Sequence, residues 1–247
     1  WCGLCAPAGA AQRDGPLMGS RPKLDARLAA AAALVRRGAR CADIGCGHGY
    51  LIAWLAASGQ IPGGYACDIH EKPLAKAAFT LSEYGVCDRV GLICCDGLMG
   101  LQAGEVEDIV IAGMGGETIW GVINAQPWTR DHKLRFILQP MTKADRLRRS
   151  LYQNGFALLR ETAVVSGDFP YTVMQAAYTG APPCEVDDAF ALCGLLLDDH
   201  SPAARRYIAK AARLVREQYE GLKKAAASHM RLERYEALMK RLEQGGR

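Results

Sequence analysis

Residues 40–50 read RCADIGCGHGY, and this stretch decides how the rest of the sequence is interpreted. Arg40 to Ile44 has the short apolar character of a buried strand, and Gly45 to Gly49 follows it as a glycine loop. The run YLIAWLAAS that starts at Tyr50 is typical of a helix. A glycine loop lets the backbone approach a ligand where a Cβ atom would clash, and the N–H groups of the next helix face the ligand's polar end. The stretch therefore predicts a ligand-binding strand, loop and helix, although a plain tight turn would give the same pattern.

Outward from this stretch, apolar runs alternate with helical segments. Further strands are expected at 63–69, 89–98, 108–116 and 133–140, and helices at 22–37, 72–84, 117–124 and 143–154. Strands that alternate with helices pair in parallel through right-handed crossovers. The pattern therefore predicts an open α/β sheet.

The last two apolar runs break this alternation. FALLRETAVV (156–165) and YTVMQAAYT (171–179) are joined by Ser166–Pro170, a connection too short to contain a helix, so they should form an antiparallel hairpin. Five alternating units followed by a hairpin resemble the sheet of class I S-adenosylmethionine methyltransferases, whereas a nicotinamide dehydrogenase would continue with parallel units. The expected fold class is α/β, a Rossmann-like methyltransferase sheet that is mostly parallel and ends in an antiparallel hairpin.

A helical extension follows the linker Ala181-Pro182-Pro183. Two seams of apolar residues repeat there at helical spacing, namely Ile208, Ala211, Val215 and Leu222, interrupted by Gln218, and Leu232, Tyr235, Met239 and Leu242. Because the seams are out of phase, a turn near 226–229 would let them pair as an antiparallel helical hairpin or coiled coil, and one long helix stays open as an alternative. We therefore expect a flexible leader (1–19), a Rossmann-like catalytic domain (20–180) and a basic helical domain (185–247).

Positive charge is concentrated in this extension. Residues 201–247 hold 12 Lys or Arg against 5 Asp or Glu, whereas residues 1–200 hold 18 against 21. Cations that approach phosphates release counterions, so this asymmetry favours a polyanionic partner. A solvated helix rich in Lys and Arg explains the charge equally well.

Acidic residues end the first three expected strands. Asp43 precedes the glycines Gly45, Gly47 and Gly49, whose spacing is tighter than in dinucleotide folds and looks like the first methyltransferase motif. Asp68 lies about twenty residues further on, where a carboxylate can accept from both ribose hydroxyls, or alternatively cap the next helix. The third strand ends with Asp96, Gly97 and Leu98, where methyltransferases place a side chain against the adenine amino group. The alternative is that Asp96 forms an Asx turn. Together these residues predict S-adenosyl-L-methionine as the cofactor.

The segments AGMGG (112–116) and ILQP (137–140) indicate a particular family among these methyltransferases. With LDARL at 24–28, DGL at 96–98, the pair Leu147-Arg148, the hairpin and the helical extension, the chain is similar to bacterial tRNA adenine-N1 methyltransferases that act on adenosine 22. The resemblance implies methylation of adenine N1 to 1-methyladenosine, with Gly113 and Met114 beside the methyl donor. It also implies that tRNA is the partner.

The chain departs from this family at one position. Members commonly have an acidic residue where this chain has Gly47, whereas His48 and Tyr50 keep their places. Because adenine N1 attacks through a ring lone pair and carries no proton, a general base is dispensable and positioning dominates. We expect His48, Tyr50 and Gln139 to form the polar walls of the base pocket. A structural role for His48, capping the helix after the loop, is the alternative.

The expected target atom lies on the Watson–Crick edge, so a paired adenosine must first be extruded. Phosphate contacts would supply the grip on folded RNA. The residues expected to make them are Arg205, Arg206, Lys210 and Arg213 in the extension, with Arg148 extending the patch and Arg27 at the mouth of the active site. A methyltransferase for a small molecule or another RNA, and a non-catalytic RNA-binding protein that keeps the cofactor pocket, are the alternatives.

Composition excludes several other classes. Half of the residues are hydrophobic, yet no run of about 18 uncharged apolar residues occurs, so a membrane span is not expected. Most cysteines lie inside apolar runs, which is typical of a reducing cytosol, and the Cys2–Cys5 pair lacks a second pair, so no metal site is expected. The residues before Gly15 do not form a secretory signal. We expect a cytoplasmic enzyme, and no obligate protein partner is evident.

Overall fold

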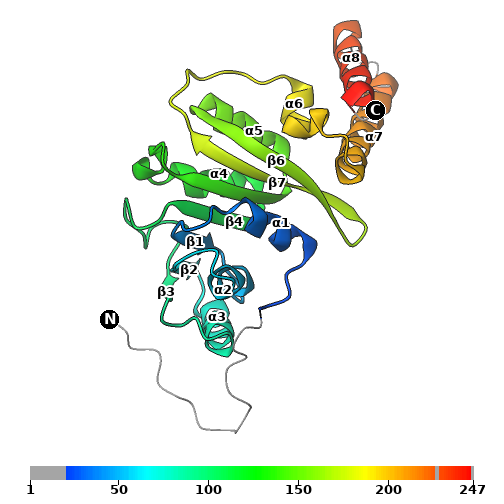
Figure 1. Cartoon of the computed structure of the whole chain (residues 1–247). Helices are drawn as coiled ribbons and strands as arrows, with labels where there is room; N and C mark the ends of the chain where they lie inside the picture. Colours follow the sequence, from blue (N-terminus) through cyan, green and yellow to red (C-terminus); the bar gives the residue numbers. More distant parts are fainter. Residues whose placement is uncertain (1–20, 226–227, 246–247) are drawn as a thin grey trace.

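The computed structural model describes residues 21–225 and 228–245, so the leader expected at 1–19 and the Cys2–Cys5 pair lie outside the described residues. One seven-stranded sheet has the order β3-β2-β1-β4-β5-β7-β6 (Figure 1). Strands β1 to β5 pair in parallel, and β7 pairs antiparallel with β5 and β6. The strands are β1 (Cys41–Ile44), β2 (Gly64–Asp68), β3 (Val90–Cys94), β4 (Asp108–Gly115), β5 (Arg135–Thr142), β6 (Phe156–Ser166) and β7 (Phe169–Tyr178). This order confirms the expected fold class.

Helices cover both faces of the sheet because its central strands are apolar on both sides. Along β4, Ile109 and Ile111 pack with α4 and α5 on one face, whereas Val110 packs with α1 and α2 on the other. The helices are α1 (Ala26–Leu34), α2 (Tyr50–Ala57), α3 (Glu71–Glu83), α4 (Gly116–Asn124), α5 (Ala144–Gln153), α6 (Asp188–Cys193), α7 (Pro202–Lys224) and α8 (His229–Gly245), with 3-10 turns η1 (Pro127–Arg130) and η2 (Gly194–Asp198). None of the helices in the described part of the chain combines the length and apolar character that a membrane crossing needs.

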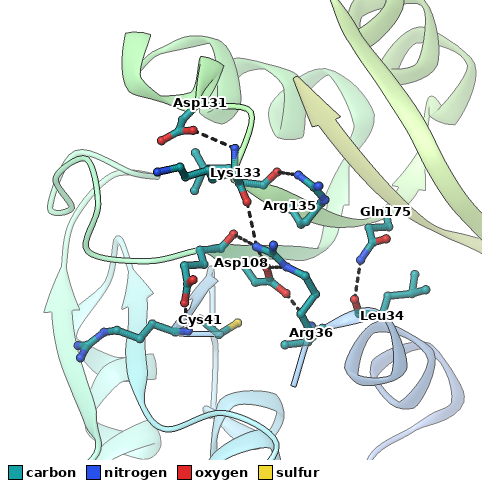
Figure 2. Close-up of polar contacts among 12 residues, drawn as sticks. Leu34, Arg36, Cys41, Asp108, Asp131, Lys133, Arg135 and Gln175 are labelled. Atoms are coloured by element: carbon teal, nitrogen blue, oxygen red, sulfur yellow. Dashed lines mark hydrogen bonds and ion pairs between the residues drawn. The ribbon is translucent and has the colours of Figure 1, made fainter. Parts of the chain in front are cut away.

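The amino edge of the sheet is fixed by one buried carboxylate (Figure 2). Asp108 begins β4 and is fully buried, and Arg36, just after α1, donates to it from its backbone N–H and from Nε, both at 2.7 Å. The same guanidinium donates to the Lys133 carbonyl at 3.0 Å. Burial raises the pKa of Asp108 although these hydrogen bonds oppose the rise. This edge is structural, and it leaves the opposite, carboxyl edge of the parallel strands for ligands.

A second buried ion pair joins the C-terminal segment to the sheet. Arg148 of α5 is 0% exposed, and its Nη2 donates to Glu161 of β6 at 2.6 Å. Its Nη1 donates to the carbonyls of Ala191 and Leu192 at 2.7 and 2.8 Å. The prediction that Arg148 contacts RNA is therefore wrong, because all its donors face the interior. The residue instead docks α6 against α5 and β6.

The helical extension forms two helices, α7 and α8, that lie side by side, and α7 packs on the β6–β7 hairpin (Figure 1). The two predicted seams meet, since Ile208, Ala211 and Val215 share a core with Tyr235, Met239 and Leu242. Gln218, which interrupts the first seam, accepts a hydrogen bond from the Tyr235 hydroxyl at 3.3 Å. The helical hairpin is confirmed and the single long helix is wrong, although residues 226–227 lie outside the described residues.

Candidate cofactor and substrate site

The loop after β1 has a backbone that only glycine adopts without strain. Gly45, Gly47 and Gly49 have φ values of 69°, 56° and 69°, in the left-handed region. The N–H groups of Gly45 and Cys46 both donate to the Cys67 carbonyl of β2, at 2.8 and 3.0 Å. The end of β2 therefore holds the loop in its turned form.

The space around the three glycines differs in a way that suits a ligand. A Cβ atom on Gly45 would lie 2.2 Å from Cε of Met114, and one on Gly49 would lie 2.9 Å from Cβ of Ala77 in α3. A Cβ atom on Gly47 would meet nothing within 4 Å. The first and third glycines thus allow close packing, while the backbone at Gly47 borders open space.

Asp68 ends β2 and is half-buried beside this loop. One carboxylate oxygen accepts from the Gly47 N–H and the other from the His70 N–H, both at 3.1 Å. The N-cap residue of α3 is His70, so the alternative in which Asp68 caps that helix is wrong. Because a carboxylate has about four acceptor positions, Asp68 retains two for the hydroxyls of a ribose.

Asp43 lies in β1 and is 4% exposed. Burial raises its pKa from 3.8 to about 7, and the nearby negative charge of Asp68 adds to the rise, while a hydrogen bond from the Ile52 backbone opposes it. Asp43 therefore supports the start of α2 from beneath the loop. At this depth, its contact with the cofactor stays a prediction.

Asp96 follows β3, next to Cys95, whose N–H donates to the Asp68 carbonyl at 3.0 Å. Asp96 is exposed, and its own carbonyl accepts from Met99 at 3.1 Å in a turn that Gly97 makes with a φ of 55°. Since β1, β2 and β3 are neighbours, the three acids lie on adjacent strand ends. The sequence predicts that the three acids lie at the carboxyl edge of the sheet, and the strand order places them next to one another there.

The end of β4 is shaped by Gly113 and by Gln139 of β5. Gly113 has a φ of 82°, and its N–H donates to Oε1 of Gln139 at 3.1 Å. Gln139 is 1% exposed, and its amide nitrogen donates to the Pro140 carbonyl at 3.1 Å. The expectation that Gln139 forms an open wall of the base pocket is corrected, because its amide is used internally. It positions the Gly113 turn beside Met114.

His48 and Tyr50 are exposed at the start of α2. Their rings meet edge to face with centroids 5.7 Å apart, and Nε2 of His48 lies 3.3 Å from Nζ of Lys76 in α3. The N-cap of α2 is Gly49, so the capping alternative for His48 is wrong. No hydrogen bond or ring contact within residues 21–225 and 228–245 joins either ring to Gln139, and their contact with the base stays a prediction.

A pocket of about 260 Å³ lies beyond the carboxyl end of β5, between the start of β7 and α7. Met141, Tyr171, Lys210 and Leu214 are among the residues that line it. Arg27 of α1 reaches the same place, because its Nη1 lies 3.0 Å from Sδ of Met141 and its guanidinium lies over the Tyr171 ring at 5.5 Å. Sequence reasoning expected Arg27 and Lys210 near RNA but missed Tyr171, which read only as a strand residue.

The basic residues of α7 lie on its outer faces, since Ala204, Ile208, Ala211 and Val215 are buried. Arg205, Arg206 and Arg213 are exposed, and Lys210 is half-buried. Arg206 donates to the Asp168 carbonyl at the tip of the β6–β7 hairpin at 3.1 Å. Within the described ranges, no three His, Cys, Asp or Glu side chains gather in a way that could hold a metal ion.

A parallel sheet that ends in an antiparallel hairpin, with a glycine loop after β1 and an acid after β2, defines a class I methyltransferase. A sequence model of the family described as a methyltransferase domain matches residues 24–174, which span the sheet from α1 to β7. The chain belongs to this family.

Individual relatives agree with this assignment. The chain is 32% identical over 154 residues to the tRNA (adenine(22)-N(1))-methyltransferase of Bacillus subtilis strain 168, a match that covers 62% of this chain and 65% of that protein. Matches to the curated relatives span 59–65% of their own lengths, which is less than two thirds. The crystal structure of the m1A22 tRNA methyltransferase TrmK of B. subtilis superposes with a TM-score of 0.76 at 26% identity, covering 91% of this chain and 99% of that one. Sp1610 of Streptococcus pneumoniae, solved with S-adenosyl-L-methionine, shares the fold at 23% identity with a TM-score of 0.71, covering 90% and 98% of the two chains.

Proposed function

We propose that this chain transfers a methyl group from S-adenosyl-L-methionine to N1 of adenosine 22 in tRNA, in the cytoplasm. The observation that carries the proposal is the likeness to the B. subtilis enzyme, which is 32% identical over 154 residues. The structural likeness to TrmK also extends over 91% of the chain, so it includes the helical extension.

The residues present fit the cofactor. Open space at Gly47, two free acceptor positions on Asp68 and an exposed carboxylate at Asp96 line up along the ends of β1, β2 and β3. Asp68 would hold the ribose hydroxyls, Asp96 the adenine amino group, and Gly113 and Met114 would border the methyl group. When bound, the cofactor supplies an electrophilic methyl group.

The chain's own part in the reaction is positioning. Adenine N1 carries no proton, so no side chain has to remove one before the carbon–nitrogen bond forms. Gln139 fixes the Gly113 turn, and Asp68 fixes the backbone at Gly47, which keeps both walls of the cofactor site rigid. Holding two reactants in a near-attack arrangement can supply about 7–11 kcal/mol of the barrier.

The helical extension supplies a basic surface next to the site. Arg205, Arg206, Lys210 and Arg213 come from the half of α7 that packs on the sheet, and Arg206 and Lys210 approach the β6–β7 hairpin. Contacts of this kind position a folded RNA without reading its sequence.

Methyl transfer to defined RNAs tests the proposal. The purified chain is incubated with labelled S-adenosyl-L-methionine and an unmodified tRNA transcript, and the nucleosides are separated by mass spectrometry. We expect 1-methyladenosine in the transcript and none when adenosine 22 is replaced by guanosine. Label that persists after this replacement would redirect the substrate assignment, and the absence of label from every RNA tested would refute the activity.

A further inference from the structure

The pocket between β5, β7 and α7 lies outside the cofactor site, and its size and lining residues suit a different ligand. Its volume of about 260 Å³ lies just below the ~300 Å³ at which pockets for drug-sized ligands begin. It therefore suits one nucleobase, not a complete adenosyl cofactor. We propose that this pocket receives the extruded target nucleotide of the RNA, with its base against Tyr171 and its phosphate between Arg27 and Lys210. The inference rests on the proposed function for its substrate.

The pocket borders the place where the methyl group would be transferred. Met141 and Thr142, which line it, follow directly after Gln139 and Pro140 of β5. Gln139 joins the two sites, because its Oε1 accepts from Gly113 and its Nε2 lies 3.7 Å from Sδ of Met141. The carboxyl end of β5 thus forms one wall shared by the pocket and the cofactor site.

Tyr171 is the centre of a cation cluster. The guanidinium of Arg27 lies 5.5 Å from the ring centroid and Nζ of Lys210 lies 5.9 Å from it, and these two residues come from α1 and α7, at opposite ends of the chain. Arg27 pairs with Asp25 at 2.7 Å, whereas Lys210 has no carboxylate partner among the described residues. An aromatic ring flanked by two cations suits a nucleotide, because the ring stacks on the base while the cations face its phosphate.

Two further observations support the binding of a ligand in this pocket. Nε of Arg27, whose guanidinium contacts Met141 and Tyr171, is buried and has no hydrogen-bond partner within the described residues, so a donor is left unused beside the pocket. Met141 and Leu214 expose 36% and 46% of their surface at the same pocket. Asp145 also lines it, and its carboxylate can accept from an exocyclic amine such as that of adenine.

Kinetics of three single variants test the pocket. Tyr171→Leu keeps the apolar bulk but removes the stacking face, and Lys210→Gln and Arg27→Gln each remove one positive charge. Lys133→Gln, on the opposite edge of the sheet, is the control with the same loss of charge. Stacking of one base predicts that Tyr171→Leu raises the KM for tRNA by about 5- to 150-fold. The affinity for S-adenosylhomocysteine, measured by calorimetry, should stay within about twofold of wild type for all three pocket variants.

A fluorescent base shows which nucleotide enters. With 2-aminopurine at the target position of the tRNA, binding of wild type should change the fluorescence, and Tyr171→Leu should abolish the change. A signal only from flanking positions, or pocket variants that behave as Lys133→Gln does, would overturn the inference. One outcome separates the two proposals. If the wild type methylates no RNA, yet Tyr171→Leu weakens binding to a labelled single-stranded RNA, the proposed function is refuted and the pocket remains supported.

Discussion

The backbone N–H of Gly47 donates to the Asp68 carboxylate at 3.1 Å, so the acid at the end of β2 fixes the loop that follows β1. The same carboxylate holds the His70 N–H, where α3 begins. One side chain therefore sets the position of two ligand-facing segments. Its loss should affect the cofactor site more than the loss of any single ribose contact.

We expect Asp68→Ala to weaken binding of S-adenosylhomocysteine by about 1–3 kcal/mol, which is about 5- to 150-fold, because ribose hydroxyls and loop N–H groups lose their acceptor. Isothermal titration calorimetry measures this directly. Asp68→Asn, which keeps one acceptor oxygen, should lose less, and Asp88→Ala, a largely exposed aspartate before β3, should lose nothing. Unchanged affinity of Asp68→Ala would remove this residue from the site.

The raised pKa of Asp43 predicts a specific pH dependence of stability. Its pKa is about 7 in the folded protein against 3.8 ordinarily, so between pH 4 and 7 the folded state binds more protons than the unfolded state. Its contribution to stability is therefore present at low pH and is lost as pH rises through this window, by about 4 kcal/mol in total.

Chemical denaturation of wild type and Asp43→Asn at pH 5, 6, 7 and 8 checks this expectation. The variant keeps an acceptor for the Ile52 N–H but cannot ionise, so it should gain stability relative to wild type as pH rises. Parallel stability curves for the two proteins over this range would show that Asp43 titrates normally.

Local sequence predicted the cofactor edge because each of its parts is set by neighbouring residues. The turn at Gly45–Gly49 and the strand end at Asp68 depend on backbone conformation and apolar runs, both of which the sequence displays. Gln139 was misjudged for a different reason: its position at a strand end was correct, but the left-handed turn at Gly113 that uses its amide lies on another strand. A hydrogen bond between two residues that are 26 positions apart in the sequence leaves no local signal.

The substrate pocket was beyond sequence reasoning for the same physical reason. Its lining residues come from β5, α5, α6, β7 and α7, with Arg27 of α1 beside them, and only the folded sheet brings Arg27 and Lys210 to the ring of Tyr171. In a strand pattern, Tyr171 is one aromatic residue among several. The sequence shows that Arg27 and Lys210 are positively charged, but it does not show that they lie beside Tyr171.

Gly47→Asp, which restores the acid found in the resembled family, tests whether that acid takes part in proton transfer. A Cβ atom at Gly47 meets no neighbour within 4 Å, and aspartate tolerates a φ of 56° better than most residues, so the variant should fold. General acid–base catalysis typically contributes about 10²–10⁴-fold. Because N1 needs no base, we expect the methylation rate to change by less than about tenfold.

The control for this variant is Gly47→Ala, which introduces the same backbone strain without the carboxylate. Single-turnover rates of both variants separate strain from chemistry. A rise of about 10² or more in Gly47→Asp alone would show that the acid acts in proton transfer and that this chain has lost it.

The buried pair of Arg148 and Glu161 predicts a stability defect without an RNA-binding defect. Both side chains are 0% exposed, and Gly194 passes so close that a Cβ atom there would lie 2.0 Å from Oε2 of Glu161. Arg148→Met leaves the carboxylate buried without its cation, which costs about 3–5 kcal/mol. The double variant Arg148→Met with Glu161→Leu should recover much of this loss, as measured by chemical denaturation, because it leaves no unpaired charge inside. At a temperature where Arg148→Met is folded, its tRNA affinity should fall with salt as steeply as that of wild type. Lys210→Gln should show a shallower slope, because Lys210 can meet a phosphate and release a counterion whereas the buried Arg148 cannot. A shallower slope for Arg148→Met would mean that its guanidinium leaves the interior to meet the RNA.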